Sequence, residues 1–295
     1  MRLFITGATG YIGGSVAEKL VASGHHVAGL VRSQDKAASL SARGIEPVIG
    51  TLDDAGVLTA AAQAADAVIH AANADHVDSV VTLVTALERS GKLLIHTSGS
   101  AIVADHADGE YAATTAFTED SYFEPVPFRR PRVDMNRYVR QAAIEKGIRS
   151  IVICPSMIYG IGRGLKADSD QIPKLIELSK QVGSGVYFGK GRNIYSNVHI
   201  DDLVDLYLLV IDKAPGGSFY FAENGHNSFT EIAQMIALSL DFGDKTTSIP
   251  IELVVTHYGE AGRLGVASNS YVCATNARRL GWSPQCPSLA EWLAV

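Results

Sequence analysis

The first apolar segment of the chain runs directly into a set of evenly spaced glycines. Leu3–Thr6 is followed by Gly7, Gly10 and Gly13, and an amphipathic helical pattern begins at Ile12. Glycines at a strand-to-helix turn let the backbone approach a ligand closely, and the helix N-terminus presents unpaired N–H groups to it. The pattern therefore predicts a cradle for a pyrophosphate, with a merely tight turn as the alternative. The expected cradle residues are Gly7, Thr9, Gly10, Tyr11, Ile12 and Gly13.

Short apolar runs alternate with amphipathic stretches through the first half of the 295-residue chain. The predicted strands are Leu3–Thr6, His26–Val31, Glu46–Ile49, Ala67–His70, Leu93–Thr97 and Ser150–Cys154. The predicted helices are Ile12–Ala22, Asp35–Arg43, Gly56–Ala64, Val77–Arg89 and Val133–Glu145. Such alternation gives a parallel sheet covered by helices on both faces, and right-handed crossovers make it doubly wound. We therefore predict an α/β fold of the Rossmann type.

The alternation becomes irregular in the second half of the chain. The polar stretch from Ala104 to Pro131 reads as a long loop, and such loops inside a domain are usually functional. Further on, helices are predicted over Asp201–Lys213 and Phe229–Leu240, and a strand over Ser218–Phe221. We expect a dinucleotide-binding Rossmann domain over residues 1–158, with sheet contributions from about 192–222. A smaller C-terminal substrate-binding lobe is expected over 159–191 and 223–295.

The end of the second predicted strand indicates which dinucleotide binds. An acidic residue at this place usually receives the ribose hydroxyls of NAD, whereas a cation accommodates the 2′-phosphate of NADP. This chain has no acid there and carries Arg32, Ser33 and Lys36 instead. These residues offer a guanidinium, a hydroxyl and a second positive charge, so we predict a preference for NADP(H) over NAD(H). An ordinary exposed role for Arg32 is the alternative.

Composition argues against nucleic acid as a partner. The chain has 25 Lys and Arg against 31 Asp and Glu, a net charge of −6. Affinity for nucleic acid rests mainly on neutralising phosphates, so a mildly acidic chain is a poor candidate. The densest basic cluster is Arg129, Arg130 and Arg132, which we interpret as a solvated helix start.

Cysteine usage and hydropathy indicate a cytoplasmic protein. The three cysteines form no CxxC pair, which fits a reducing compartment and predicts neither a disulfide framework nor a metal site. The best internal apolar run, Leu203–Ile211, contains Asp205 and is shorter than the ~20 residues that span a bilayer. The apolar segment after Met1 lacks the charged region and long apolar core of a signal peptide. We therefore expect no membrane contact.

Six further motifs follow one another along the chain. They are Gly50–Asp53, Asp66–Ala72, Ile95–Ser100, Pro155–Gly160, Val198–Asp202 and Leu280–Pro284. In that order they resemble G-D-L-x-D, D-x-V-I-H-x-A, the strand end that carries a catalytic Ser or Thr, R-P-x-x-V-Y-G, V-H-V-D-D and L-G-W-x-P. These are motifs of the extended short-chain dehydrogenase/reductases, in the NAD-dependent epimerase/dehydratase branch. Thr51 and Cys154 depart from the pattern, standing where that branch has an acid and an arginine.

The resemblance implies positions for further site residues. It places five residues along the cofactor: Leu52, Ala71, Ala72, Thr97 and Pro155. It also places the catalytic hydroxyl near Ser98 or Ser100, because the ungapped match puts Gly99 at the usual serine position.

The superfamily's central catalytic motif is missing from this chain. Counting back from the sixth strand places Tyr-x-x-x-Lys at Phe128 and Arg132, and none of the eleven tyrosines has a lysine four residues later. Phenylalanine has no proton to donate, and arginine keeps the charge but cannot act as a base. Arg132 is expected to contact the nicotinamide ribose, and another group must transfer the proton. The candidates are Ser98, Ser100, Tyr111, Tyr122 and Tyr159.

Four residues are expected at the substrate: Tyr111, Tyr159, Arg163 and His199. Arg163 lies in a glycine-rich segment where the related branch meets substrate, and could clamp an anion or simply be exposed. His199 precedes Asp201 and Asp202, and we interpret one of these acids as the N-cap of the following helix rather than as part of a catalytic or metal site.

We therefore expect an NADP(H)-dependent oxidoreductase or epimerase/reductase-like enzyme acting on a small carbonyl or hydroxyl substrate. A nucleotide sugar is suggested by the resemblance alone. A non-catalytic NADP(H)-binding redox-sensing regulator is the alternative, which the missing tyrosine and lysine favour. An isomerase or lyase that uses the cofactor transiently also fits. The resemblance further implies a homodimer through Val77–Arg89 and Val133–Glu145.

Overall fold

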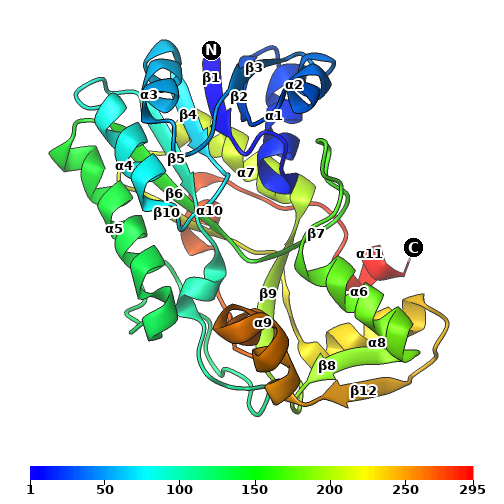
Figure 1. Cartoon of the computed structure of the whole chain (residues 1–295). Coiled ribbons are helices and arrows are strands. Elements are labelled where there is room, and N and C mark those ends of the chain that lie inside the picture. The colour runs from blue at the N-terminus through cyan, green and yellow to red at the C-terminus, as the bar shows by residue number, and fades with distance from the viewer. Residues whose placement is uncertain (295) are drawn as a thin grey trace.

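Seven parallel strands form the central sheet of the computed structural model, which describes residues 1–294 (Figure 1). Their order is β10-β6-β5-β4-β1-β2-β3. The direction of strand addition reverses next to β1, which is the arrangement of a doubly wound Rossmann sheet. The predicted fold class is confirmed.

The elements of the first half follow the predicted alternation closely. They are β1 (Arg2–Thr6), α1 (Tyr11–Ala22), β2 (His26–Val31), α2 (Gln34–Ser41), β3 (Ile45–Ile49), α3 (Ala55–Ala64), β4 (Ala67–His70), α4 (Val77–Ala86), β5 (Leu93–Thr97), α5 (Arg130–Glu145) and β6 (Arg149–Pro155). The strands are apolar on both faces because helices cover both sides of the sheet. Helix α5 begins three residues before the predicted Val133, since Pro131 is tolerated in a first helical turn.

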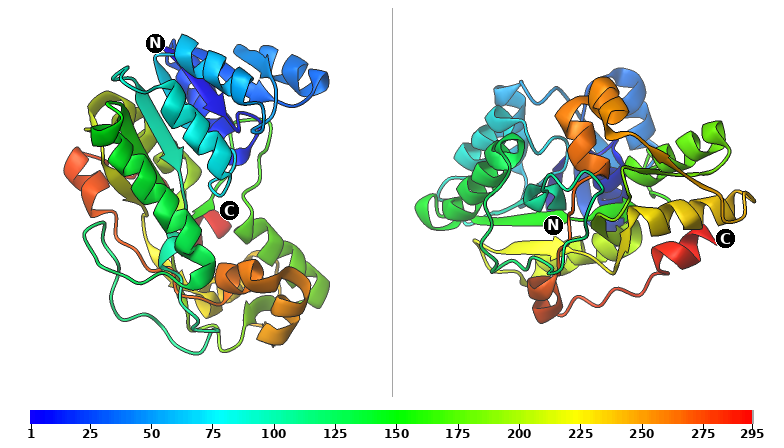
Figure 2. Two further views of the ribbon diagram at one scale, coloured as in Figure 1. Left: turned by 60° about the vertical axis from the view of Figure 1, so that its left-hand side comes forward. Right: turned by 90° about the horizontal axis from the view of Figure 1, so that it is seen from below.

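Two layers of helices enclose the sheet (Figure 2). Helices α3, α4 and α5 pack side by side on one face, and α1 packs on α7 (Ile200–Lys213) on the other. Val77 and Val81 on α4 and Ile144 on α5 are exposed, so these helices leave apolar side chains uncovered. The homodimer expected through these helices stays a prediction.

The second half of the chain builds a smaller lobe with its own core. Its elements are β7 (Met157–Tyr159), α6 (Gln171–Val182), β8 (Gly185–Phe188), β9 (Ile194–His199), β11 (His226–Ser228), α8 (Phe229–Ser239), β12 (Thr246–Ile249), α9 (Ile251–Val266), α10 (Thr275–Leu280) and α11 (Leu289–Leu293). Phe229 and Ile232 of α8 pack with Tyr195 of β9 in a hydrophobic cluster separate from the main core.

Residues 192–222 divide between the two parts. Strand β10 (Phe219–Ala222) pairs with β6 and extends the large sheet, as expected. Strand β9 instead forms a three-stranded sheet with β7 and β11. The domain boundaries themselves stay a prediction.

The start of α7 differs from the prediction. His199, rather than Asp201 or Asp202, is the N-cap, and its side chain accepts the N–H of Asp201. Asp202 is buried and accepts the N–H groups of Gln285 and Cys286, so it fastens the C-terminal segment to the helix. A histidine ring nitrogen can accept a hydrogen bond like a capping oxygen, which the usual N-cap preferences do not capture.

The polar stretch between Ala104 and Pro131 is largely irregular, as predicted. A short 3₁₀ turn over Pro127–Arg129 leads into α5, and one β-bridge joins Phe117 to Val272. Among the described residues, no helix combines the length and the apolar character needed to span a membrane.

A buried hydroxyl pair connects the sheet to α7 and gives a stability prediction. Thr97 Oγ1 and Tyr207 Oη lie 2.6 Å apart, and both side chains are buried. Tyr207→Phe leaves Thr97 without this partner, and we expect the free energy of unfolding to fall by about 1–2 kcal/mol. Urea unfolding measures the change. The double variant Thr97→Val/Tyr207→Phe should lose less than the sum of the single variants, and strict additivity would contradict the pairing.

Candidate functional site

The turn between β1 and α1 has the geometry of a cofactor cradle. Gly7 has φ +78°, and a Cβ added there would lie 2.6 Å from the carbonyl oxygen of Ala71. A Cβ on Gly13 would lie 2.4 Å from the carbonyl oxygen of Gly7. Helix α1 begins after Gly10 with no side chain capping it, so its first N–H groups remain available. The turn fits a pyrophosphate, which needs close backbone approach and free amide donors.

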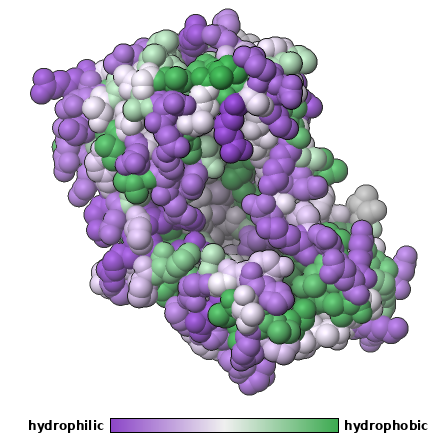
Figure 3. Space-filling model, in the orientation of Figure 1, coloured by the Kyte–Doolittle hydropathy of each residue, from purple (hydrophilic) through white to green (hydrophobic). Residues whose placement is uncertain are grey.

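One cavity of about 550 Å³ begins at this turn and extends between the two lobes. Figure 3 shows the molecule hollowed at this level, with mostly hydrophilic residues around the rim. Its walls include the turn, the ends of β4, β5 and β6, the start of α5, and residues of the smaller lobe. The lining residues predicted from sequence are Gly10, Tyr11, Ile12, Ala71, Ala72, Ser98, Ser100, Arg132 and Pro155.

Tyr11 joins the two lobes across the top of the cavity. Its hydroxyl lies 2.8 Å from the carbonyl oxygen of Gly160 and 3.1 Å from that of Tyr159. Burial, aided by the nearby charge of Asp201, raises the pKa of the Tyr11 phenol. This tyrosine therefore acts as a neutral hydrogen-bond donor that holds the smaller lobe against α1.

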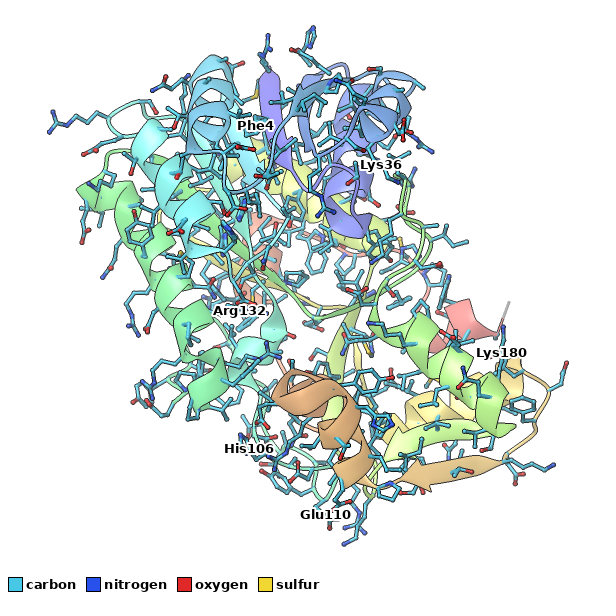
Figure 4. All side chains as sticks on the ribbon, in the orientation of Figure 1. Phe4, Lys36, His106, Glu110, Arg132 and Lys180 are labelled. Atoms are coloured by element: carbon cyan, nitrogen blue, oxygen red, sulfur yellow. The ribbon has the colours of Figure 1, made fainter. Side chains whose placement is uncertain are left out.

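Arg132 faces the cavity from the first turn of α5 and is held by Asp75 (Figure 4). Its Nε lies 2.7 Å from Asp75 Oδ1, and a second N–H pairs with Oδ2. The guanidinium also lies close to Gly99, since a Cβ there would be 3.7 Å from Arg132 Nη1. The bidentate pair fixes the plane of the guanidinium beside the end of β5.

The structure separates the two serines proposed for catalysis. The hydroxyl of Ser100 is paired with that of Ser270 at 2.7 Å, so it is already engaged. The hydroxyl of Ser98 is buried beside the thiol of Cys154 and makes no hydrogen bond to a nitrogen or oxygen atom among residues 1–294. Thr97 was expected along the cofactor, but strand alternation points its side chain toward Tyr207 on α7, and it does not line the cavity.

The residues expected at the 2′-phosphate lie together on the surface. Arg32 and Lys36 are exposed near the end of β2, and the hydroxyl of Ser33 caps α2 by accepting the N–H of Lys36. Leu52 packs against the main core with part of its side chain exposed. Figure 4 labels Lys36 on the upper part of the molecule, away from Arg132.

None of the four predicted substrate residues lines this cavity. The hydroxyl of Tyr159 donates to the carbonyl oxygen of Pro287 at 2.7 Å, and its ring packs edge-on against His199. Arg163 pairs with Asp201 at 2.6 Å, and Tyr111 lies exposed on the long loop. Tyr159 and His199 were located by family motifs, but their side chains pack against each other, and Arg163 is used in an ion pair.

His199, Asp201 and Cys286 bring three potential metal ligands within 4.8 Å of one another, which the sequence did not predict. Two of these three side chains already have hydrogen-bond or ion-pair partners. His199 Nδ1 accepts the N–H of Asp201, and Asp201 Oδ1 pairs with Arg163.

Two stacked histidines lie on β4 and β5, close to the strand ends that border the cavity. His70 and His96 are opposite each other on β4 and β5, with ring centroids 5.6 Å apart. Burial lowers the pKa of His70 to about 4 and that of His96 to about 3. Both rings are therefore neutral near neutral pH and supply no proton to the site.

Sequence reasoning missed the part of the site contributed by the smaller lobe. Lys166, Gln171 and Tyr195 line the cavity, and so does Gly265 of α9.

Sequence reasoning also misjudged the exposure of the basic cluster. Of its three arginines only Arg130 is exposed, whereas Arg129 is buried and lines the cavity together with Arg132. A polar residue in an irregular segment carries no periodic signal of burial, so the sequence offered no means of finding Arg129.

Known proteins resemble this chain over most of its length. The model of the "NAD dependent epimerase/dehydratase family" matches residues 3–220. Oxidase ucsJ of Acremonium sp is 31% identical over 344 residues, covering 100% of this chain and 96% of that protein. A 4-hydroxy-2-methyl-3-oxo-4-farnesyl-3,4-dihydroquinoline-1-oxide ketoreductase of Stigmatella aurantiaca is 29% identical over 248 residues, covering 76% and 69%.

A solved structure shows the same fold. A double mutant of DesIV, a dTDP-glucose 4,6-dehydratase from Streptomyces venezuelae with NAD and DAU bound, superimposes with a TM-score of 0.78. The two chains are 21% identical, and the match covers 100% of this chain and 95% of the other.

The Asp75–Arg132 pair predicts a pH-dependent contribution to stability. Hydrogen bonds from Arg132 hold the pKa of the Asp75 carboxyl below its ordinary value of 3.8. The contribution is therefore complete above about pH 4 and is lost as the pH falls through the folded-state pKa. We expect Asp75→Asn to lower the Tm at about pH 7, and its difference from the wild type to shrink steadily as the pH falls below about 4. Thermal unfolding across this range tests it, with Asp134→Asn, whose carboxylate pairs with Arg137 on the surface, as control. A pH-independent difference would contradict this assignment.

Proposed function

Because the chain belongs to the NAD dependent epimerase/dehydratase family, we propose that it is an NADP(H)-dependent oxidoreductase for a small carbonyl or hydroxyl compound. The observation that carries the proposal is the single cavity that joins the glycine turn to side chains of the smaller lobe. A cofactor lying on the turn and a substrate held by the smaller lobe would meet beside Ser98 and Arg132. The free thiols Cys154, Cys273 and Cys286 fit a reducing compartment, and we place the enzyme in the cytoplasm.

The chain offers a place for each part of the cofactor. The Gly7–Gly13 turn would hold the pyrophosphate, and Arg32 with Lys36 would receive the 2′-phosphate. Arg132 would contact the nicotinamide ribose from its fixed position against Asp75. When bound, the nicotinamide supplies or accepts the hydride.

We assign polarisation of the substrate carbonyl to Ser98. Its hydroxyl makes no hydrogen bond to a nitrogen or oxygen atom of residues 1–294, so rotation about the Cα–Cβ bond can turn it into the cavity at the cost of only its contact with the Cys154 thiol. A hydroxyl donor there would stabilise the negative charge that develops on the carbonyl oxygen. Arg132 adds a positive charge beside the same strand end. Ser100, Tyr11 and Tyr195 also line the cavity, but their hydroxyls are bonded to Ser270, Gly160 and Leu264.

In our assignment Phe128 and Arg132 occupy the positions of the family's tyrosine and lysine. Phe128 is half exposed, packs against Arg129 and does not line the cavity. The same substitution favours the rival, a non-catalytic redox-sensing regulator. A cavity lined partly by the smaller lobe, where a substrate could bind, favours an enzyme. The oxidase and ketoreductase names of two relatives favour it as well. An isomerase or lyase would use the same cavity.

Arg32→Asp tests the cofactor preference. The substitution removes the cation and places a repelling charge beside the 2′-phosphate, whereas it leaves a hydrogen-bond acceptor for the ribose of NADH. We expect the Kd for NADPH to rise about 100-fold and that for NADH to change less than about threefold. Fluorescence titration of the reduced cofactors measures both, with Arg43→Asp as a surface control. Equal losses for the two cofactors would exclude Arg32 as the selector.

Ser98→Ala tests the reaction. We would first screen small aldehydes, ketones and their alcohols for NADPH oxidation or NADP⁺ reduction by the wild type. On any substrate found, Ser98→Ala should lower kcat/KM about 100-fold with the Kd for NADPH unchanged. Ser100→Ala should lower it by less than about threefold, because that hydroxyl is engaged by Ser270. Tight NADPH binding without turnover of any compound, and a protein partner specific for one redox form, would establish the regulator instead.

A further inference from the structure

Arg129 is a buried cation in the wall of the cavity. It ends the 3₁₀ turn before α5 and is 8% exposed. Its Nε is buried and has no hydrogen-bond partner among the described residues. Arg130, the next residue, is exposed and pairs with Glu124, so the two neighbours have opposite environments.

The carboxylates near Arg129 are already paired with other cations. Asp75 binds Arg132 through both of its oxygens. Glu260 contacts Arg263 at 3.4 Å and His106 at 3.4 Å. Burial lowers the pKa of Arg129, and the positive charge of Arg132 acts in the same direction. Two guanidinium groups therefore line one cavity, and Asp75 pairs with only that of Arg132. Arg129 is left with the ring of Phe128, whose centroid lies 5.2 Å from its Cζ.

A buried charge without a partner is costly, and proteins normally compensate it. Since the cavity is the space that Arg129 borders, an anion entering it would supply the compensation. Guanidinium groups bind carboxylate and phosphate oxygens through two parallel hydrogen bonds.

The position of Arg129 assigns this anion to the substrate. Arg129 lines the cavity together with Tyr195 and Gly265, which belong to the smaller lobe. The Tyr195 hydroxyl lies 2.7 Å from the carbonyl oxygen of Leu264 in α9. Arg129 thus faces residues of the smaller lobe, whereas the pyrophosphate turn belongs to the other lobe.

We propose that Arg129 binds an anionic group of the substrate, so that the reacting compound carries a carboxylate or a phosphate in addition to its carbonyl or hydroxyl. That the bound anion belongs to a substrate rests on the proposed function, but binding of an anion at Arg129 does not require turnover. Lys166 adds a third cation to the same cavity, after Arg129 and Arg132, although it also pairs with Asp170 at 2.9 Å.

Binding to the NADPH-loaded protein tests the anion site without any reaction. Benzoate, phenyl phosphate and the neutral benzamide serve as probes, and thermal shift gives their affinities. We expect benzoate, phenyl phosphate or both to raise the Tm, and benzamide to have no effect. The two anions distinguish a carboxylate from a phosphate. Arg129→Gln should weaken anion binding at least about tenfold, and Arg129→Lys should weaken it less.

Arg130 serves as the control for Arg129, because it is the next residue and is exposed. Arg130→Gln should bind the anions as the wild type does, and Arg129→Gln should keep the wild-type Kd for NADPH. Anions that do not bind, or that bind Arg129→Gln equally well, would overturn the proposal. A loss of NADPH affinity in Arg129→Gln would assign the arginine to the cofactor instead. A ligand-free Arg129→Gln much less stable than Arg130→Gln would give Arg129 a structural role. Anion binding without turnover of any compound would support the anion site and contradict the proposed oxidoreductase activity.

Discussion

The contact between two backbone segments, the Gly7–Gly13 turn and the end of β4 at Ala71, sets the position of everything else in the site. Van der Waals radii leave no room for a Cβ at Gly7 or Gly13. The start of α1 is therefore held against the sheet with its amide groups free. The ends of β4, β5 and β6 follow at the same edge, because parallel strands with short crossovers all finish there. The cavity opens at that edge.

The sequence was most informative where a pattern repeats. The six strands were predicted to within one residue and the helices between them to within three, since continuous apolar runs and helical periodicity leave little choice for elements such as His26–Val31 and Ala67–His70. The glycine turn was equally clear, because its chemistry is local. The first half of the site was therefore predictable from the sequence.

The second half of the site depends on contacts between distant segments, which no local pattern encodes. Arg129 is buried and lines the same cavity as Tyr195 and Gly265 of the smaller lobe, and no pattern in residues 127–132 indicates those neighbours. Ser98 and Ser100 are two residues apart and chemically alike. Only Ser270, far along the chain, distinguishes them by engaging one of them. His199 likewise became a helix cap through local geometry that residue preferences do not anticipate.

The hydrogen bonds of Tyr11 carry a consequence for how such a protein can diversify. The hydroxyl reaches the smaller lobe through the carbonyl oxygens of Tyr159 and Gly160, which are main-chain atoms present in every residue type. Only Gly160 is restricted in residue type, since it has φ +97° and a Cβ there would lie 2.5 Å from His199 Nε2. As long as that glycine is kept, side chains elsewhere in the smaller lobe can change while its attachment to α1 through Tyr11 stays the same.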